Sequence, residues 1–166
     1  MRPGADQIEL SGYVPGAIAG VTGLHARYYH DNWGFGLYFE SKVATELSEF
    51  LNRFREGRDG FWVATSGGQI VGSIAIDGME AGNRGARLRW FIVAPELQGR
   101  GIGRRLMREA LDFCRRAGIK RVYLWTFAGL DAARHLYEEF GFVLREEHRD
   151  TQWGKMVLEQ LFDLYL

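Results

Sequence analysis

The sequence is short of the features that mark several classes of protein. It contains a single cysteine, Cys114, which excludes an internal disulfide framework and fits a reducing compartment. Lysine plus arginine and aspartate plus glutamate both number 21, so no overall field of one sign attracts nucleic acid or an anionic membrane. No run approaches the roughly 18 apolar residues of a membrane span, and the opening MRPGADQIELSG has no apolar signal core. We therefore expect a cytoplasmic protein with no membrane partner and no direct nucleic-acid partner.

What is present is the composition of an ordinary folded chain. Of the 166 residues, 46% are hydrophobic and 14% aromatic, which is far from the composition of disordered proteins. The length suits one core, and we find no repeat, low-complexity tract or proline-rich linker. We expect a single domain over residues 1–166, ordered from Ile8 onward.

Apolar periodicity and turn residues predict the order of helices and strands. Ser66-Gly67-Gly68 lies between two β-rich runs and is typical of a tight antiparallel hairpin. Gly118 stands where the helix over 103–117 needs a C-cap, and Asp131 stands where the next helix needs an N-cap. We expect strands near 8–14, 61–64, 70–76, 86–92, 122–125, 142–144 and 155–158, and helices near 18–28, 39–54, 103–117 and 131–140. This order, β-α-α-β-β-β-α-β-α-β-β, predicts an α/β protein with a mixed sheet and helices on its faces.

The segment VAPELQGRGIGRRL, residues 93–106, carries the main chemical signal. Gly99, Gly101 and Gly103 alternate with other residues between a predicted strand and the start of a predicted helix. Such a turn gathers unpaired backbone N–H groups and the positive end of a helix dipole around one concavity. Glycine permits positive φ angles and the close approach of an anion. We expect this turn to bind phosphate, with Arg100, Arg104 and Arg105 able to add charge-assisted bonds.

Two well-known phosphate motifs do not fit the spacing. A P-loop has Lys-Ser/Thr after its last glycine, whereas Arg104-Arg105 follow Gly103. The dinucleotide fingerprint needs a third glycine at the position of Arg104. The pattern Gln98-x-x-Gly101-x-Gly103 instead resembles the pyrophosphate loop of the GNAT superfamily of acyl-CoA-dependent N-acetyltransferases.

Three further segments, in the matching order, resemble that family over about residues 60 to 145. They are the strand LRWFIVAP that ends directly before the loop, the hairpin that ends in Gly72-Ser73-Ile74, and the segment from Ala133 through Tyr137 to Gly141-Phe142. The stretch from Trp125 to Gln160 also resembles GNAT domains fused to MarR-type winged-helix regulators. The resemblance implies a GNAT fold of about seven strands and four helices, with its fourth and fifth strands splayed apart.

The resemblance also implies a site for acetyl-CoA. In this family the pantetheine arm pairs with the backbone of the fourth strand, the pyrophosphate rests on the glycine loop, and a tyrosine near the sulfur protonates the departing thiolate. That tyrosine corresponds to Tyr137. The implied coenzyme-binding residues are Phe91, Ile92, Val93, Gln98, Gly99, Arg100, Gly101, Ile102, Gly103, Arg104, Ala133 and Tyr137. An amine attacks the thioester directly, so Cys114 is expected to be a core residue, and no metal is expected.

The sequence departs from the family at two positions. Histone-type relatives have a glutamate as general base where this chain has Arg87, and many members have a pantetheine-binding asparagine where this chain has Leu130. We consider Glu80 first as the base, then Asp77, Glu40 and His30, with a chain of water molecules as the alternative. Backbone groups of residues 126–130 are the candidate replacement for the asparagine contact.

The acceptor site in this family is shaped by the first two helices, and here that region is rich in aromatic residues. Tyr29, Trp33 and Glu40 are the candidates for binding an amine through cation–π and charge contacts. The alternative is that these aromatics are core or pack in a homodimer, as the apolar tail LEQLFDLYL also could. The leading function is transfer of an acetyl group from acetyl-CoA to a small-molecule or peptide amine, and the alternative is a non-catalytic acyl-CoA-binding regulatory module.

Overall fold

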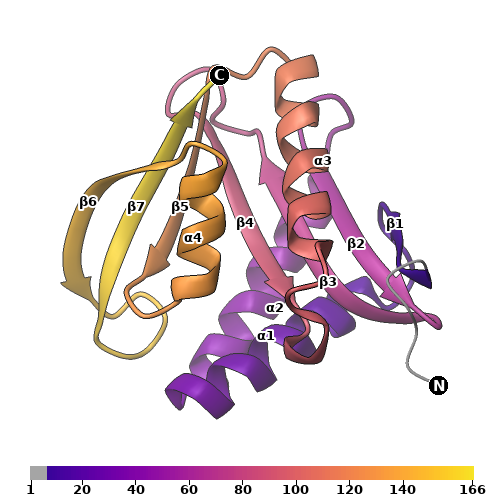
Figure 1. Cartoon of the computed structure of the whole chain (residues 1–166), viewed down its shortest axis with the longest axis vertical. Helices are drawn as coiled ribbons and strands as arrows, with labels where there is room; N and C mark the ends of the chain where they lie inside the picture. Colours follow the sequence, from indigo (N-terminus) through magenta and orange to yellow (C-terminus); the bar gives the residue numbers. More distant parts are fainter. Residues whose placement is uncertain (1–6) are drawn as a thin grey trace.

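The computed structural model describes residues 7–166 and contains one seven-stranded sheet with helices on both faces (Figure 1). The strands lie in the order β1-β2-β3-β4-β5-β7-β6, and β4 and β5 form the parallel pair. The strands are β1 (Glu9–Ser11), β2 (Gly60–Ser66), β3 (Gln69–Asp77), β4 (Ala86–Val93), β5 (Arg121–Phe127), β6 (Val143–Asp150) and β7 (Val157–Tyr165). The helices are α1 (Ala17–Trp33), α2 (Leu37–Asn52), the short 3₁₀ helix η2 (Pro95–Leu97), α3 (Ile102–Arg116) and α4 (Asp131–Glu139). This arrangement confirms the predicted mixed α/β fold and the order of its elements.

Two apolar clusters lie on opposite faces of the sheet. α3 supplies Leu106, Met107 and Leu111 to one cluster, which also contains Tyr137 of α4. α1 and α2 supply residues such as Val21, Phe39 and Leu47 to the other. Figure 1 shows α3 and α4 in front of the sheet and α1 and α2 behind it. The two helix pairs are therefore separated by the sheet, except where its strands part.

Glycines with positive φ end several strands and helices where the sequence predicted. Gly67 and Gly68 both have positive φ in the β2–β3 hairpin, as a two-residue turn between twisted strands requires. Gly118 follows α3 in the left-handed region, with its N–H bonded to the Arg115 carbonyl. Cys114, on the inner face of α3, is completely buried, and burial raises the pKa of its thiol to about 12.

Three expectations about elements are wrong. Leu130, not Asp131, occupies the N-cap position of α4 and makes no side-chain cap, because Asp131 already lies in the first helical turn. The strand expected at 155–158 instead begins at Val157 and continues through the apolar tail to Tyr165, paired along the whole of β5. The strand expected at 142–144 continues to Asp150, because β7 offers it a partner throughout.

The separation of β4 from β5 is the feature that creates a site. These strands pair only at Ala86 with Val122 and Arg87 with Tyr123, whereas β4 keeps its pairing with β3 as far as Val93. Beyond Arg87 the two strands form an open V (Figure 1). The backbone of β4 from Leu88 onward thus has no strand partner on its β5 side.

Candidate active site

The V between β4 and β5 is part of a cleft with a volume of about 540 Å³. Its walls come from α1 and α2 on one side, from the loop before α3 and from α4 on the other, and from both parted strands. The cleft therefore connects the two faces of the sheet. A reactant bound from the α3 side can meet one bound from the α1 side inside it.

A β-bulge in β4 accompanies the start of the V. Ser73 opposes Ile92 and Ala75 opposes Arg89, so two residues of β4, Trp90 and Phe91, face the single β3 residue between them. Trp90 has φ of 46°, the one non-glycine residue with positive φ among residues 7–166. The bulge breaks the strict inward and outward alternation that the sequence predicted for this strand. Trp90 consequently joins the apolar cluster under α1 and α2.

The glycine loop has the geometry expected of an anion site. Gly99 and Gly101 have φ of 79° and 82°, and a Cβ on either would face open space. The first bond of α3 runs from Arg105 N–H to the Gly101 carbonyl, which leaves the preceding N–H groups at the helix start outside the helical ladder. Gln98 closes the loop by donating from Nε2 to the Val93 carbonyl at 3.1 Å. The loop therefore presents backbone donors at the end of β4.

Gly103 has a different role from the other two glycines of the loop. A Cβ at Gly103 would lie 3.3 Å from Leu136 Cδ2 and 3.4 Å from Phe91 Cζ. Gly103 thus lets α3 approach α4 and β4 closely, beside the cleft.

The arginine side chains of this segment are engaged with protein groups. Arg104 forms two hydrogen bonds of 2.9 Å with the Glu139 carboxylate on α4, and this contact holds the pKa of Glu139 below its usual range. Arg105 donates to the Ile8 carbonyl at 3.3 Å. In this structure the guanidinium groups of Arg104 and Arg105 are bound by Glu139 and Ile8, and a contact of either with a phosphate remains a prediction.

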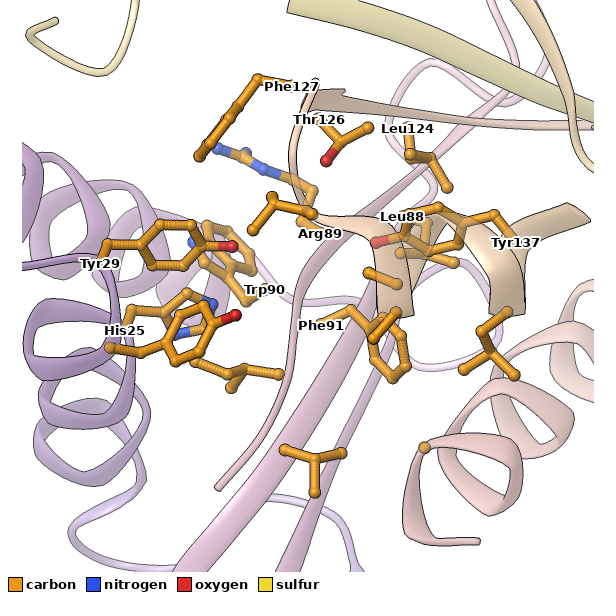
Figure 2. A pocket seen from close by; sticks show the side chains of 18 of the residues that line it. His25, Tyr29, Leu88, Arg89, Trp90, Phe91, Leu124, Thr126, Phe127 and Tyr137 are labelled. Carbon is orange, nitrogen blue, oxygen red and sulfur yellow. The ribbon is translucent and has the colours of Figure 1, made fainter. Parts of the chain in front are cut away.

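Tyr137 lies on α4 and is 6% exposed, packed against Phe91, Phe142 and Phe162. Burial raises the pKa of its phenol well above the usual value, so the hydroxyl stays protonated at neutral pH. Figure 2 shows this hydroxyl pointing into the cleft. Tyr137 therefore places a protonated hydroxyl at the edge of the V.

Tyr29 of α1 faces Tyr137 from the other side of the cleft (Figure 2). Burial raises the pKa of Tyr29, and the neighbouring Tyr137 and Tyr28 raise it further. Its ring packs on Phe35, Phe39 and Phe127 with centroid distances of 5.8, 4.9 and 5.9 Å. Tyr29, one of the predicted acceptor residues, is thus part of a packed aromatic wall and brings a polar atom to the cleft.

His25, one turn before Tyr29, also lines the cleft and was missed from the sequence. Its Nδ1 lies 2.8 Å from the Val21 carbonyl, which can only accept, so Nδ1 carries the hydrogen and Nε2 a lone pair. Burial lowers the pKa of His25 to about 4, against the opposing effect of that hydrogen bond. A single histidine on an amphipathic helix gives no sequence signal that distinguishes this neutral, buried state.

Most of the predicted coenzyme-binding residues meet at this cleft. All of those predicted from Phe91 to Arg104 except Arg100 line it, as do Ala133 and Tyr137, and Leu130 lines it where the family has asparagine. Their roles remain predictions. The structure therefore brings together at one cleft residues of β4, of the glycine loop with the start of α3, and of α4.

The predicted bases and two of the predicted acceptor residues lie outside this cleft. Glu80 is exposed in the turn after β3, at the closed end of the V, and Asp77 is bound by Arg53. Glu40 is exposed on α2, and Trp33 packs edge-on against Phe127 at a centroid distance of 5.0 Å. The carboxylate that does line the α2 side of the cleft, Glu46, was not predicted.

Comparison with known proteins identifies the family. The sequence pattern of the Acetyltransferase (GNAT) family matches residues 18–142, which includes α1, the bulged strand, the glycine loop and α4. The chain belongs to the GNAT acetyltransferase family. The match to the α1–α2 region extends beyond the segments on which the sequence resemblance was based.

Curated GNAT relatives are similar over most of this chain. An N-acetylaspartate synthetase from Danio rerio is 31% identical over 143 residues, which are 84% of this chain and 50% of the relative. N-acetyltransferase 8 from Rattus norvegicus is 32% identical over 109 residues, 63% of this chain and 49% of the relative. The chain thus spans about half the length of these curated relatives.

Solved structures of other proteins share the fold. The structure of yncA from Salmonella typhimurium with its cofactor acetyl-CoA superposes with a TM-score of 0.75 at 17% identity and covers 96% of this chain and 94% of that one. Spermidine N-acetyltransferase from Vibrio cholerae, in complex with CoA and spermine, gives a TM-score of 0.70 at 22% identity and covers 96% of both chains. At these identities the likeness shows the fold alone. Within residues 7–166, no helix combines the length and the apolar run needed to cross a membrane.

Proposed function

We propose that this protein is an acetyl-CoA-dependent N-acetyltransferase that acts on a primary amine, with residues 7–166 forming one catalytic unit. The observation that carries the proposal is the coincidence of the open V, the glycine loop and the Tyr137 hydroxyl at one cleft. The family to which the chain belongs and the fold it shares with acetyl-CoA-bound structures support it.

The residues present fit coenzyme A. The unpaired edge of β4 beyond Arg87 can accept the amide groups of a pantetheine arm as an added strand would pair. The N–H groups at the start of α3 suit a pyrophosphate, and glycine at 99 and 101 leaves the space beside them open. When bound, acetyl-CoA supplies an activated acetyl thioester, which this orientation directs into the cleft.

The chemistry is a direct transfer. The amine lone pair attacks the thioester carbonyl carbon, so a C–N bond forms as the C–S bond breaks. Tyr137 gives its phenolic proton to the departing thiolate, and its raised pKa keeps that proton available at neutral pH. The proton lost by the amine passes to water and restores the phenol. We assign no side chain as the base, because Glu80 does not line the cleft, His25 has a pKa of about 4 and Glu46 is already ion-paired with Lys42 and Arg89.

Three finer predictions from the sequence belong with this proposal. The resemblance to GNAT domains fused to MarR-type regulators, a cytoplasmic location and a homodimer all remain hypotheses. None of the relatives reported above is named as such a fusion protein. The relatives' names also differ in the acceptor they imply, so a name alone does not assign one here.

The test is a pair of measurements on the purified chain. Acetyl-CoA should bind and raise the melting temperature, and a mixed panel of amines should cause steady thiol release with an acetylated product in the mass spectrum. Binding without thiol release for any amine would favour the alternative, a non-catalytic acyl-CoA-binding regulatory module. No binding of acetyl-CoA at millimolar concentration would overturn both.

A further inference from the structure

Arg87, at the apex of the V, is partly buried and carries a buried donor atom that has no partner among residues 7–166. It is the last residue of β4 that pairs with β5, and its side chain lines the cleft. Its Nε atom is buried and has no hydrogen-bond partner, and Arg87 takes part in no ion pair among residues 7–166. A buried N–H donor without an acceptor costs free energy, and a ligand that accepts a hydrogen bond from it would recover that cost.

Arg89, two residues further along β4, is held in place by the protein. Its guanidinium lies 4.1 Å from the centre of the Trp90 ring and forms ion pairs with Glu46 at 3.2 Å and with Asp77 at 3.7 Å. Asp77 in turn accepts two hydrogen bonds from Arg53. The nearby carboxylates are therefore already engaged, and neither of them forms an ion pair with Arg87.

The charge on this side of the cleft is positive. Lys42, Arg87 and Arg89 line it together with one carboxylate, Glu46, which is shared between Lys42 and Arg89. Burial, and in addition the proximity of Arg87, lowers the pKa of Arg89 to about 10, so Arg89 remains a cation at neutral pH. A polyamine or a lysine-rich peptide would meet charges of its own sign here.

These arginines are separate from the phosphate-binding end of the cleft. Arg89 contacts Glu46 of α2, which places it on the face covered by α1 and α2, whereas the glycine loop lies beyond the other end of β4. The extended strand between Arg87 and Val93 covers roughly 20 Å at about 3.3 Å per residue. Arg87 therefore faces the acceptor rather than the coenzyme phosphates.

We propose that the acceptor is a primary amine that also carries a carboxylate, an amino acid rather than a polyamine or a protein lysine, and that Arg87 binds this carboxylate. The inference rests on the proposed acetyl transfer, whose substrate class it specifies. The guanidinium of Arg87 can pair with both oxygens of a carboxylate, and the fixed charge of Arg89 beside it strengthens the attraction. The amine is thereby directed along the cleft toward the hydroxyls of Tyr29 and Tyr137, which face each other in Figure 2.

The test compares amines that differ by one carboxylate. Alanine and ethylamine form one pair, glutamate and 4-aminobutyrate another, and aspartate and asparagine a third, with spermidine as the polycation. In at least one pair, we expect kcat/KM from thiol release to be about 10- to 100-fold higher for the member with the additional carboxylate. A charge-assisted contact in a buried site predicts a difference of this size. Equal or faster acetylation of ethylamine and spermidine would overturn the inference and leave acetyl transfer intact.

Variants of Arg87 make the test specific to the site. Arg87→Met should lower kcat/KM for the preferred amino acid by about 10- to 100-fold, mainly through KM, and leave the rate with ethylamine within about twofold. Arg87→Lys should recover part of the loss, since it restores the charge but not the two-pronged contact. The control is Arg116→Met, at the exposed C-terminal end of α3, which should change neither rate.

A binding measurement separates this inference from the proposed function. Calorimetric titration of the same amino acid into protein saturated with CoA should show binding that Arg87→Met weakens by a similar factor. Such binding without any turnover would contradict the proposed function and support the carboxylate site. Turnover of amino acids that is indifferent to Arg87→Met would remove the site while keeping the enzyme.

Discussion

The Ser73 hydroxyl, completely buried on β3, donates a 2.6 Å hydrogen bond to the Trp90 carbonyl on β4. Trp90 is the bulge residue with positive φ, so this bond satisfies a carbonyl that the bulge removes from the regular ladder. The contact links a small polar side chain of one strand to the local shape of the next. The bulge lies within the stretch of β4 that has parted from β5.

Ser73→Ala is therefore expected to destabilise the bulge of β4 that lies at the cleft. Loss of the hydroxyl leaves a buried carbonyl without its donor, which should lower the free energy of unfolding by about 1–3 kcal/mol in urea denaturation. Acetyl-CoA affinity should fall as well, because the edge of β4 is less well fixed. Ser48→Ala on α2 removes a bond of the same length, to the Ala44 carbonyl, away from the cleft and should leave acetyl-CoA affinity unchanged. Equal affinities for both variants would contradict a role of the bulge.

Gly101→Ala should impair both the loop and its ligand. The left-handed φ of 82° strains any side chain, at a cost of about 1 kcal/mol, and a methyl group would stand in the open space beside the N–H groups. We expect the dissociation constant of acetyl-CoA to rise at least about tenfold in calorimetric titration. Gly118→Ala introduces the same strain at the far end of α3, where φ is 71° and space is also open, and should lower only the melting temperature.

Tyr137→Phe should slow the chemical step. The ring remains packed among Phe91, Phe142 and Phe162, so the fold and acetyl-CoA binding should persist, whereas the departing thiolate loses its proton donor. We expect kcat to fall by about 10²-fold with the dissociation constant of acetyl-CoA within about twofold. Tyr165→Phe, at an exposed position on β7, is the control. A kcat equal to that of the unaltered protein would exclude Tyr137 as the donor.

His25 should make stability depend on pH. Its pKa of about 4 lies below the ordinary value of 6.5 because burial disfavours the cation, so between these values the unfolded chain binds a proton that the folded chain does not. Its contribution to stability is therefore complete above about pH 6.5 and is lost as the pH falls toward 4, by on the order of 3 kcal/mol.

The measurement is urea denaturation of the protein and of His25→Gln from pH 4.5 to 7.5. His25→Gln keeps a donor for the Val21 carbonyl but cannot titrate, so its stability should fall less steeply with acid. Parallel curves for the two proteins would show that His25 is not the group responsible.

Substitution of Arg87 and of Arg89 by methionine should have opposite effects on the free energy of unfolding. Arg87→Met removes an unpartnered buried donor and should raise the free energy of unfolding by about 1 kcal/mol. Arg89→Met takes one of two cationic partners from Glu46 and from Asp77 and removes the contact with the Trp90 ring, so it should lower that free energy. Urea denaturation of both variants checks the pair, and a destabilised Arg87→Met would indicate that the guanidinium has a structural role.

The sequence alone determined the features that depend on neighbouring residues. Hairpin glycines, the C-cap at Gly118, the amphipathic α3 and the spacing of Gln98, Gly101 and Gly103 are local, because backbone geometry and helix ends need particular residues at short intervals. From these the fold class, the order of elements and the glycine turn before α3 could be predicted. The position of Tyr137 relative to the loop followed from the family motif.

Only the tertiary structure decided which distant residues meet and in what state of charge. The bulge at Trp90 shifts the strand register, which alternation in the sequence does not reveal. His25 and Tyr29 come to face Tyr137 because α1 packs across the opening of the V, while Glu80 is left at its closed end. Whether Arg87 is paired or bare depends on how the neighbouring strands and α2 engage the nearby carboxylates. Burial and ion pairing depend on the assembled environment. The sequence showed only that Arg87 stands where histone-type relatives have a glutamate, whereas the structure makes Arg87 the candidate residue that selects the acceptor.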